Sequence, residues 1–136
     1  MFEKPILKYA SGSESFERAT AVGVISECIR GMEEAVTPST TTLLPLLLKR
    51  LTDEDAEVKS NAAFATGLLV QHSGNEKVLL RELSSILGRL EPLLQMEGAR
   101  ARDNAAGCVA RVVMRCVIYI PGSFHLRFWT ISGISG

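Results

Sequence analysis

The amino-acid sequence predicts an all-α protein built from repeated helix pairs, and three observations support that prediction. First, the segment Val-Lys-Ser-Asn-Ala-Ala at 58–63 recurs 43 residues later as Ala-Arg-Asp-Asn-Ala-Ala at 101–106. Second, apolar or small residues around both copies recur at steps of three and four, a spacing that lines one face of a helix. Third, leucine-rich segments of a different kind, at 41–51 and 84–94, alternate with these copies.

A third copy extends the periodicity toward the N-terminus. Residues 20–27 align with 64–71 at a shift of 44, which superimposes Gly23 on Gly67. Glycine inside a helix costs roughly 1 kcal/mol relative to alanine, so its recurrence predicts a neighbouring helix too close to admit a Cβ. Chance agreement between small residues is the alternative.

A repeat of this length indicates a fold class. Periods of about 40 to 47 residues with helical patterning are typical of HEAT and armadillo solenoids, whose units bury their apolar faces by stacking on one another. We therefore predict a HEAT-repeat α-α superhelix, a short solenoid of about two and a half repeats. Such a stack favours a protein-interaction surface over an enzyme.

The elements follow in order. The sequence predicts the end of one helix at 4–10 and further helices near 14–32, 38–52, 55–73, 77–96 and 98–118. Asp55 places acidic side chains at the start of the fourth helix, where backbone N–H groups lack partners, and Thr37-Pro38 reads as a cap followed by proline. Pro45 and Pro92 each predict a kink or a boundary between shorter helices, or alternatively the start of a new helix.

Two parts of unequal regularity are expected. Residues 1–116 carry the repeats. Residues 117–136 are rich in β-branched and aromatic residues and lack the leucine-proline helix that the period requires. We expect this tail to be poorly ordered or to fold back over the last exposed apolar face.

Composition agrees with a folded domain. The 136 residues are 46% hydrophobic and 22% charged, with a net charge of zero. The charge is unevenly spread, because residues 14–57 hold nine acids and four bases (net −5) and residues 58–115 hold five acids and eight bases (net +3). The acidic half could attract a basic partner, although a charge run can equally be a solvated face.

Other functional classes find little support. We expect no signal peptide, and the sequence has no run of roughly 20 apolar residues. Its three cysteines have no metal-ligand spacing and are expected to be reduced, in the cytosol or nucleus. The two histidines, His72 and His125, belong to no set of nucleophile, base and orienting residue, and we expect no catalysis, metal or cofactor. Basic residues interleaved with aromatics, the pattern of a nucleic-acid interface, are missing.

Four blocks together carry a family resemblance. They are residues 20–32 (Thr-Ala-Val-Gly-Val-Ile-Ser-Glu-Cys-Ile-Arg-Gly-Met), 44–48 (Leu-Pro-Leu-Leu-Leu), 55–69 (Asp-Ala-Glu-Val-Lys through Gly-Leu-Leu) and 102–107 (Arg-Asp-Asn-Ala-Ala-Gly). In order and spacing they resemble the karyopherin-beta nuclear import receptors. The resemblance implies a receptor that binds basic cargo such as ribosomal proteins and histones, contacts nucleoporins, and in its full-length form releases cargo to GTP-bound Ran. It also implies a location in cytoplasm and nucleus, without direct binding to nucleic acid or membrane.

The second helix of each pair lines the inner side of such a solenoid. That places five candidate protein-binding residues on or near the inner surface: Glu27, Arg30, Glu57, Asn61 and Asn104. In HEAT families, the Asp and the basic residue of Asp-x-x-x-Lys tend to form a ladder between repeats. Asp55 and Lys59 fit this pattern, whereas Gly98 replaces the Asp of the next copy. A HEAT-repeat scaffold outside nuclear transport remains the alternative function.

Overall fold

The fold is a double layer of helices, as expected. The computed structural model describes residue 2 and residues 4–118, with side chains through Cys116. Its elements are α1 (Lys4–Tyr9), α2 (Ser15–Met32), the 3-10 helix η1 (Glu33–Ser39), α3 (Thr40–Leu51), α4 (Ala56–His72), α5 (Glu76–Arg81), α6 (Leu83–Leu94) and α7 (Ala99–Ile118). The tail expected from residue 117 lies outside the described residues except for positions 117 and 118, which continue α7.

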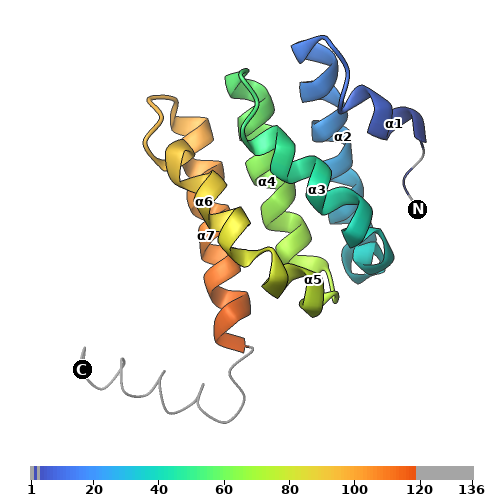
Figure 1. Ribbon diagram of the computed structural model, residues 1–136, viewed down its shortest axis with the longest axis vertical. Coiled ribbons are helices and arrows are strands. Elements are labelled where there is room, and N and C mark those ends of the chain that lie inside the picture. Colours follow the sequence, from blue (N-terminus) through green and yellow to red (C-terminus); the bar gives the residue numbers. More distant parts are fainter. Residues whose placement is uncertain (1, 3, 119–136) are drawn as a thin grey trace.

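The layers follow the repeat. Helices α2, α4 and α7 lie side by side, and α3 and α6 cross in front of them, with α1 beside α2 (Figure 1). Three pairs result, α1/α2, α3/α4 and α6/α7, of which the first has a short outer helix. The helix α4 lies between α2 and α7 and contacts both, so it occupies the centre of this layer.

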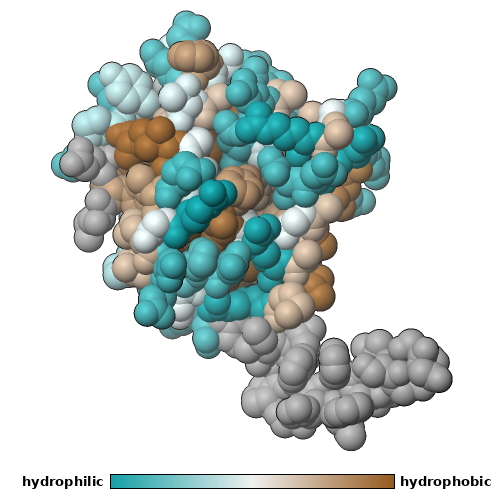
Figure 2. Space-filling model, turned by 180° about the vertical axis from the view of Figure 1, so that it is seen from behind, coloured by the Kyte–Doolittle hydropathy of each residue, from teal (hydrophilic) through white to brown (hydrophobic). Residues whose placement is uncertain are grey.

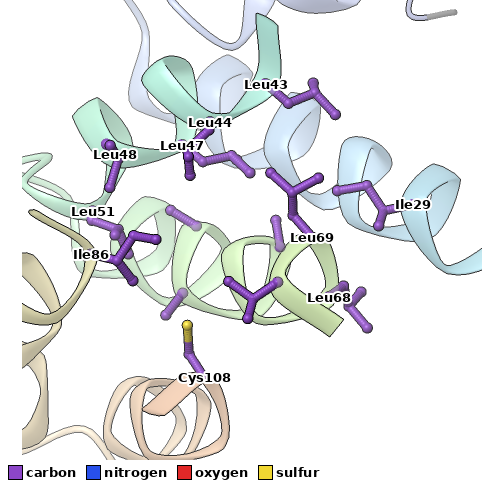
Figure 3. Packing of buried hydrophobic residues seen from close by; sticks show 14 of the residues in the cluster. Ile29, Leu43, Leu44, Leu47, Leu48, Leu51, Leu68, Leu69, Ile86 and Cys108 are labelled. Carbon is purple, nitrogen blue, oxygen red and sulfur yellow. The ribbon is translucent and has the colours of Figure 1, made fainter. Parts of the chain in front are cut away.

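The predicted stripe forms the core. The α4 positions Val58, Ala62, Ala65 and Leu69 are all fully buried, and their equivalents in α7, 43 residues on, are at most 4% exposed. Figure 3 shows leucines of α3 gathered over Leu69, with Ile29 of α2 and Cys108 of α7 at the sides of the cluster. Burial of one leucine contributes about 2 kcal/mol, so this interlayer cluster is the main source of stability.

Helix starts depend on side-chain caps. The carboxylate of Asp55 accepts hydrogen bonds from the backbone N–H groups of Glu57 (2.9 Å) and Val58 (3.1 Å), as predicted for the start of α4. The predicted start at Thr37-Pro38 is wrong, because both residues lie inside η1 and α3 begins at Thr40.

Several helix boundaries predicted from the sequence differ from the observed ones. Pro45 and Pro92 lie inside α3 and α6 and neither starts nor ends a helix. The segment predicted as one helix over 77–96 is divided at Glu82, whose φ of −95° and ψ of 5° leave the helical region, and α6 ends at Leu94.

The glycine prediction holds at one position. A Cβ on Gly67 would lie 3.2 Å from the Cα of Cys108, so α7 approaches α4 too closely for a larger residue. A Cβ on Gly23 would meet only Asn61 Nδ2, at 3.7 Å, which is ordinary contact. Close approach at Gly23 is therefore wrong, since α4 meets this position only through the Asn61 side chain and not through its backbone.

Within the described ranges, no helix is both long enough and apolar enough to cross a bilayer.

Candidate protein-binding surface

The candidate residues belong to α2, α4 and α7, the three helices that lie side by side (Figure 1). We call the side of α2, α4 and α7 that faces away from α3 and α6 the second-helix face. Figure 2 views the molecule from behind relative to Figure 1 and shows mostly hydrophilic residues across the middle of this side, with apolar patches between them. A surface of this mixed kind suits a protein partner.

Glu27 and Arg30 form one cluster near the end of α2. Both are exposed, and Arg30 Nη1 lies 3.8 Å from Glu27 Oε2, a solvated ion pair of little energetic value. The Arg30 guanidinium also lies 5.3 Å from the centroid of the Phe64 ring, which belongs to α4. This cation–π contact holds a positive charge over a half-exposed aromatic ring.

Asn61 and Asn104 connect neighbouring helices. The amide Nδ2 of Asn61 donates to the Ala19 carbonyl oxygen (3.0 Å), and Asn61 Oδ1 accepts from Arg100 Nη2 (2.9 Å). Asn104 Nδ2 donates to the carbonyl oxygen (3.1 Å) and the hydroxyl (2.9 Å) of Ser60. The two asparagines thus bridge α2 to α4 and α4 to α7 at equivalent repeat positions.

Glu57 stands apart from these bridges. It is exposed in the first turn of α4, and no ion pair within 4 Å involves it in the described part of the chain. The structure therefore brings Glu27 and Arg30 together, and no ion pair or hydrogen bond joins Glu57 to either of them among the described residues. Whether any of the five residues touches a partner stays a prediction.

The expected Asp-Lys ladder is wrong. The Asp55 carboxylate caps its own helix, and Lys59 makes no ion pair within 4 Å among the residues described. The asparagine bridges occupy the place of the ladder. The amide Nδ2 of an asparagine donates to a backbone carbonyl oxygen. A carboxylate only accepts hydrogen bonds, so it could not bond that oxygen.

Sequence reasoning missed a buried ionic network at the opposite turns. Arg18 Nε and Nη2 donate to Asp53 Oδ2 (2.8 Å) and Oδ1 (3.0 Å), and Arg18 Nη1 donates to the carbonyl oxygens of Gly12 and Ser13, both at 3.0 Å. Arg50 Nη1 lies 3.4 Å from Asp53 Oδ2. The network ties the α1–α2 turn to the α3–α4 turn, and the acidic run at 53–55 was its only sequence signal.

This network controls the protonation of Asp53. Burial by itself would raise the pKa of Asp53, but the hydrogen bonds from Arg18 and from the Asp55 N–H, with the charges of Arg18 and Arg50, lower it below its usual value. Asp53 is therefore a buried carboxylate held ionised by its partners.

A second missed group lies where α4 ends. Arg111 Nε donates to Gln71 Oε1 (2.9 Å), and Arg115 donates to the carbonyl oxygens of Gln71 (3.2 Å) and Ser73. Cationic side chains at a helix C-terminus interact favourably with the helix dipole. Both arginines belong to α7 and so fasten it to α4.

Two further observations concern metal ligands and the buried thiol. No group of three or more His, Cys, Asp or Glu side chains that could hold a metal ion occurs among the described residues. Burial raises the pKa of the Cys108 thiol to about 12, against the lowering effect of the Arg111 charge, so this thiol stays protonated at neutral pH.

The fold and the repeat define the class of protein. The model of the HEAT repeat family matches residues 43–73, which run from α3 through α4. The described residues form an all-α HEAT-repeat segment, as the period predicts.

Curated relatives identify the kind of HEAT protein that the chain resembles. It is 38% identical over 122 residues to "Probable importin subunit beta-4" of Schizosaccharomyces pombe, covering 89% of this chain and 11% of the relative. It is 37% identical over 110 residues to importin-4 of Homo sapiens (80% of this chain, 10% of the relative) and 39% identical over 99 residues to importin-4 of Mus musculus (72% and 9%). The chain thus spans about one-tenth of the length of these importin homologues.

Proposed function

We propose that this chain is part of the solenoid of a nuclear transport receptor and binds protein cargo for import into the nucleus in a Ran-dependent pathway. One observation carries the proposal: identity of 38% to a protein named as an importin subunit extends over 89% of the chain. A similarity of this length extends well beyond one HEAT unit. Cytoplasm and nucleus are the corresponding locations.

Basic proteins such as ribosomal proteins and histones are the proposed cargo. Glu27 of α2 and Glu57 of α4 are both exposed and could offer two carboxylates to basic side chains. Arg30, held over Phe64, presents a guanidinium beside Glu27. Asn61 and Asn104 contribute at the edges of that surface, where their amides already fix the spacing of α2, α4 and α7.

Nucleoporins and Ran are proposed as partners of a full-length receptor. A segment of three helix pairs offers too little surface to enclose a folded cargo, so the affinity of this chain alone is expected to be weak. The proposal assigns binding and assigns no enzymatic reaction.

The test is a binding titration with a fluorescent basic peptide of histone-tail composition. Glu27→Gln combined with Glu57→Gln is expected to weaken binding about fivefold at low salt, because two carboxylates leave the surface. Glu76→Gln with Glu91→Gln, which removes two exposed carboxylates from α5 and α6, is the matched control and should leave binding within about twofold. Equal loss in both double variants would refute the proposed surface.

A second measurement separates transport from general scaffolding. A longer chain of the same family, with and without GTP-loaded Ran, is expected to release the peptide only when Ran is present. Equal release of the peptide with and without GTP-loaded Ran would favour a HEAT-repeat scaffold outside nuclear transport.

A further inference from the structure

The side chain of Arg111 lies in a notch between α4 and α7 that two glycines keep open. A Cβ added to Gly107 would lie 3.1 Å from Arg111 Nη1, and one added to Gly67 would lie 3.4 Å from both Cδ and Nη1 of Arg111. Contacts this short would force the arginine to move. The absence of side chains at both positions therefore makes room for the guanidinium along the surface of the two helices.

The guanidinium is also oriented. Its Nε donates to Gln71 Oε1 at 2.9 Å, an exposed hydrogen bond that favours one orientation of the group. Among the described residues, Arg111 makes no ion pair within 4 Å, and its Nη atoms donate no hydrogen bond. Guanidinium is charged at every physiological pH, so a half-buried positive charge remains here without a compensating anion.

An apolar hollow adjoins this charge. It has a volume of about 370 Å³ and is lined by Gln71, Ala110, Arg111, Met114 and Arg115. Met114 contributes an exposed apolar side chain, 62% accessible to solvent. A fixed arginine fork beside an apolar wall suits a carboxylate attached to an apolar body.

We infer that the hollow between Arg111 and Met114 is a docking site for an acidic peptide segment that carries an apolar side chain next to its carboxylate. The carboxylate pairs with the Nη atoms of Arg111, and the apolar side chain packs on Ala110 and Met114. Charge complementarity supports this occupant, because residues 58–115 carry a net charge of +3. The site is opposite in charge to the one proposed for basic cargo and does not depend on it.

The experiment measures fluorescence anisotropy of a labelled peptide of alternating Asp and Leu, titrated with the full chain. Peptides with Asn or Lys in place of Asp are the controls, and both are expected to bind at least tenfold more weakly. Arg111→Gln is expected to weaken binding of the acidic peptide about tenfold, which corresponds to about 1.4 kcal/mol. The matched control is Arg102→Gln, which removes an exposed charge from the same helix and should change binding less than about twofold.

Further outcomes keep the proposal open to refutation. Circular dichroism checks the fold of each variant. If Arg111→Gln lowers the helical signal, Met114→Ser is the test variant instead, and it is expected to weaken peptide binding about fivefold. Equal affinity for the three peptides, or equal effects of Arg111→Gln and Arg102→Gln, would overturn the site. So would binding that appears only in a chain ending at Ile118, because the full chain would then not bind the peptide.

Discussion

Asp53 is a buried carboxylate that accepts hydrogen bonds from Arg18 and from the Asp55 N–H and lies beside Arg50. Replacing it with Asn removes the charge that Arg18 and Arg50 surround, and leaving buried cations unpaired is expected to lower the free energy of unfolding by about 3 kcal/mol. Urea denaturation followed by circular dichroism measures the change. Glu54→Gln is the control, since that carboxylate is 91% exposed and 3.8 Å from Arg18, and it should cost less than about 0.5 kcal/mol.

Asp53 also predicts how the free energy of unfolding falls at acid pH. The pKa of Asp53 is lower in the folded chain than in the unfolded chain, so the unfolded state binds the additional proton and stability rises with pH across that interval. The contribution is complete above the unfolded pKa of about 4 and is lost as pH falls through the lower, folded value. The stability difference between the wild type and Asp53→Asn should therefore shrink below about pH 4. A difference that stays constant from pH 7 to pH 2 would contradict this linkage.

Glu33 is a second residue whose conformation predicts an effect. It ends α2 with a φ of 51° and a ψ of −129°, and it is the residue other than glycine with positive φ in the described part of the chain. Such a backbone favours glycine, so Glu33→Gly is expected to raise the free energy of unfolding by about 1 kcal/mol. Glu34→Gly is the matched control next in sequence and should lower it by about 0.5 kcal/mol. Thermal unfolding of the two variants should shift in opposite directions.

At the scale of elements, the distance between α4 and α7 is set by Gly67. Alanine there gains helix propensity, but its Cβ would lie 3.2 Å from the Cα of Cys108, which cannot rotate away. We expect Gly67→Ala to lower the free energy of unfolding by about 1 kcal/mol net. Gly88→Ala in α6 meets nothing within 4 Å and should raise it by up to about 1 kcal/mol. Stabilisation by both changes would mean that α7 can shift outward freely.

The elements also show what the sequence could predict. The helix register was predictable because one face of each helix must be apolar, and Val58, Ala62 and Leu69 repeat that face at a fixed interval. The split at Glu82 was not predictable, because no proline or glycine next to Glu82 marks it in the sequence.

The candidate site was predictable only in part. Periodicity placed Asn61 and Asn104 on helices facing the same way, but their bonds to Ala19 and Ser60 depend on contacts more than 40 residues apart in sequence. The Arg18–Asp53 pair was missed for the same reason, since 35 residues separate its partners and neither belongs to the repeated segment.

At the scale of the whole molecule, three stacked helix pairs are expected to unfold as one unit, because each pair buries its apolar face only against its neighbours. Cys108 reports on this. Its thiol is fully buried, and its pKa is raised to about 12, so iodoacetamide at pH 8 can reach it only after unfolding, whereas Cys28 is exposed in the native chain. Mass spectrometry should find Cys28 modified quickly and Cys108 modified at a rate set by the unfolded fraction.

Asp53→Asn, a change in the first two pairs, should then accelerate labelling of Cys108 in the third pair about a hundredfold, the factor that corresponds to about 3 kcal/mol. If the rate of Cys108 labelling is the same with and without Asp53→Asn, α7 opens on its own and the three pairs do not unfold cooperatively.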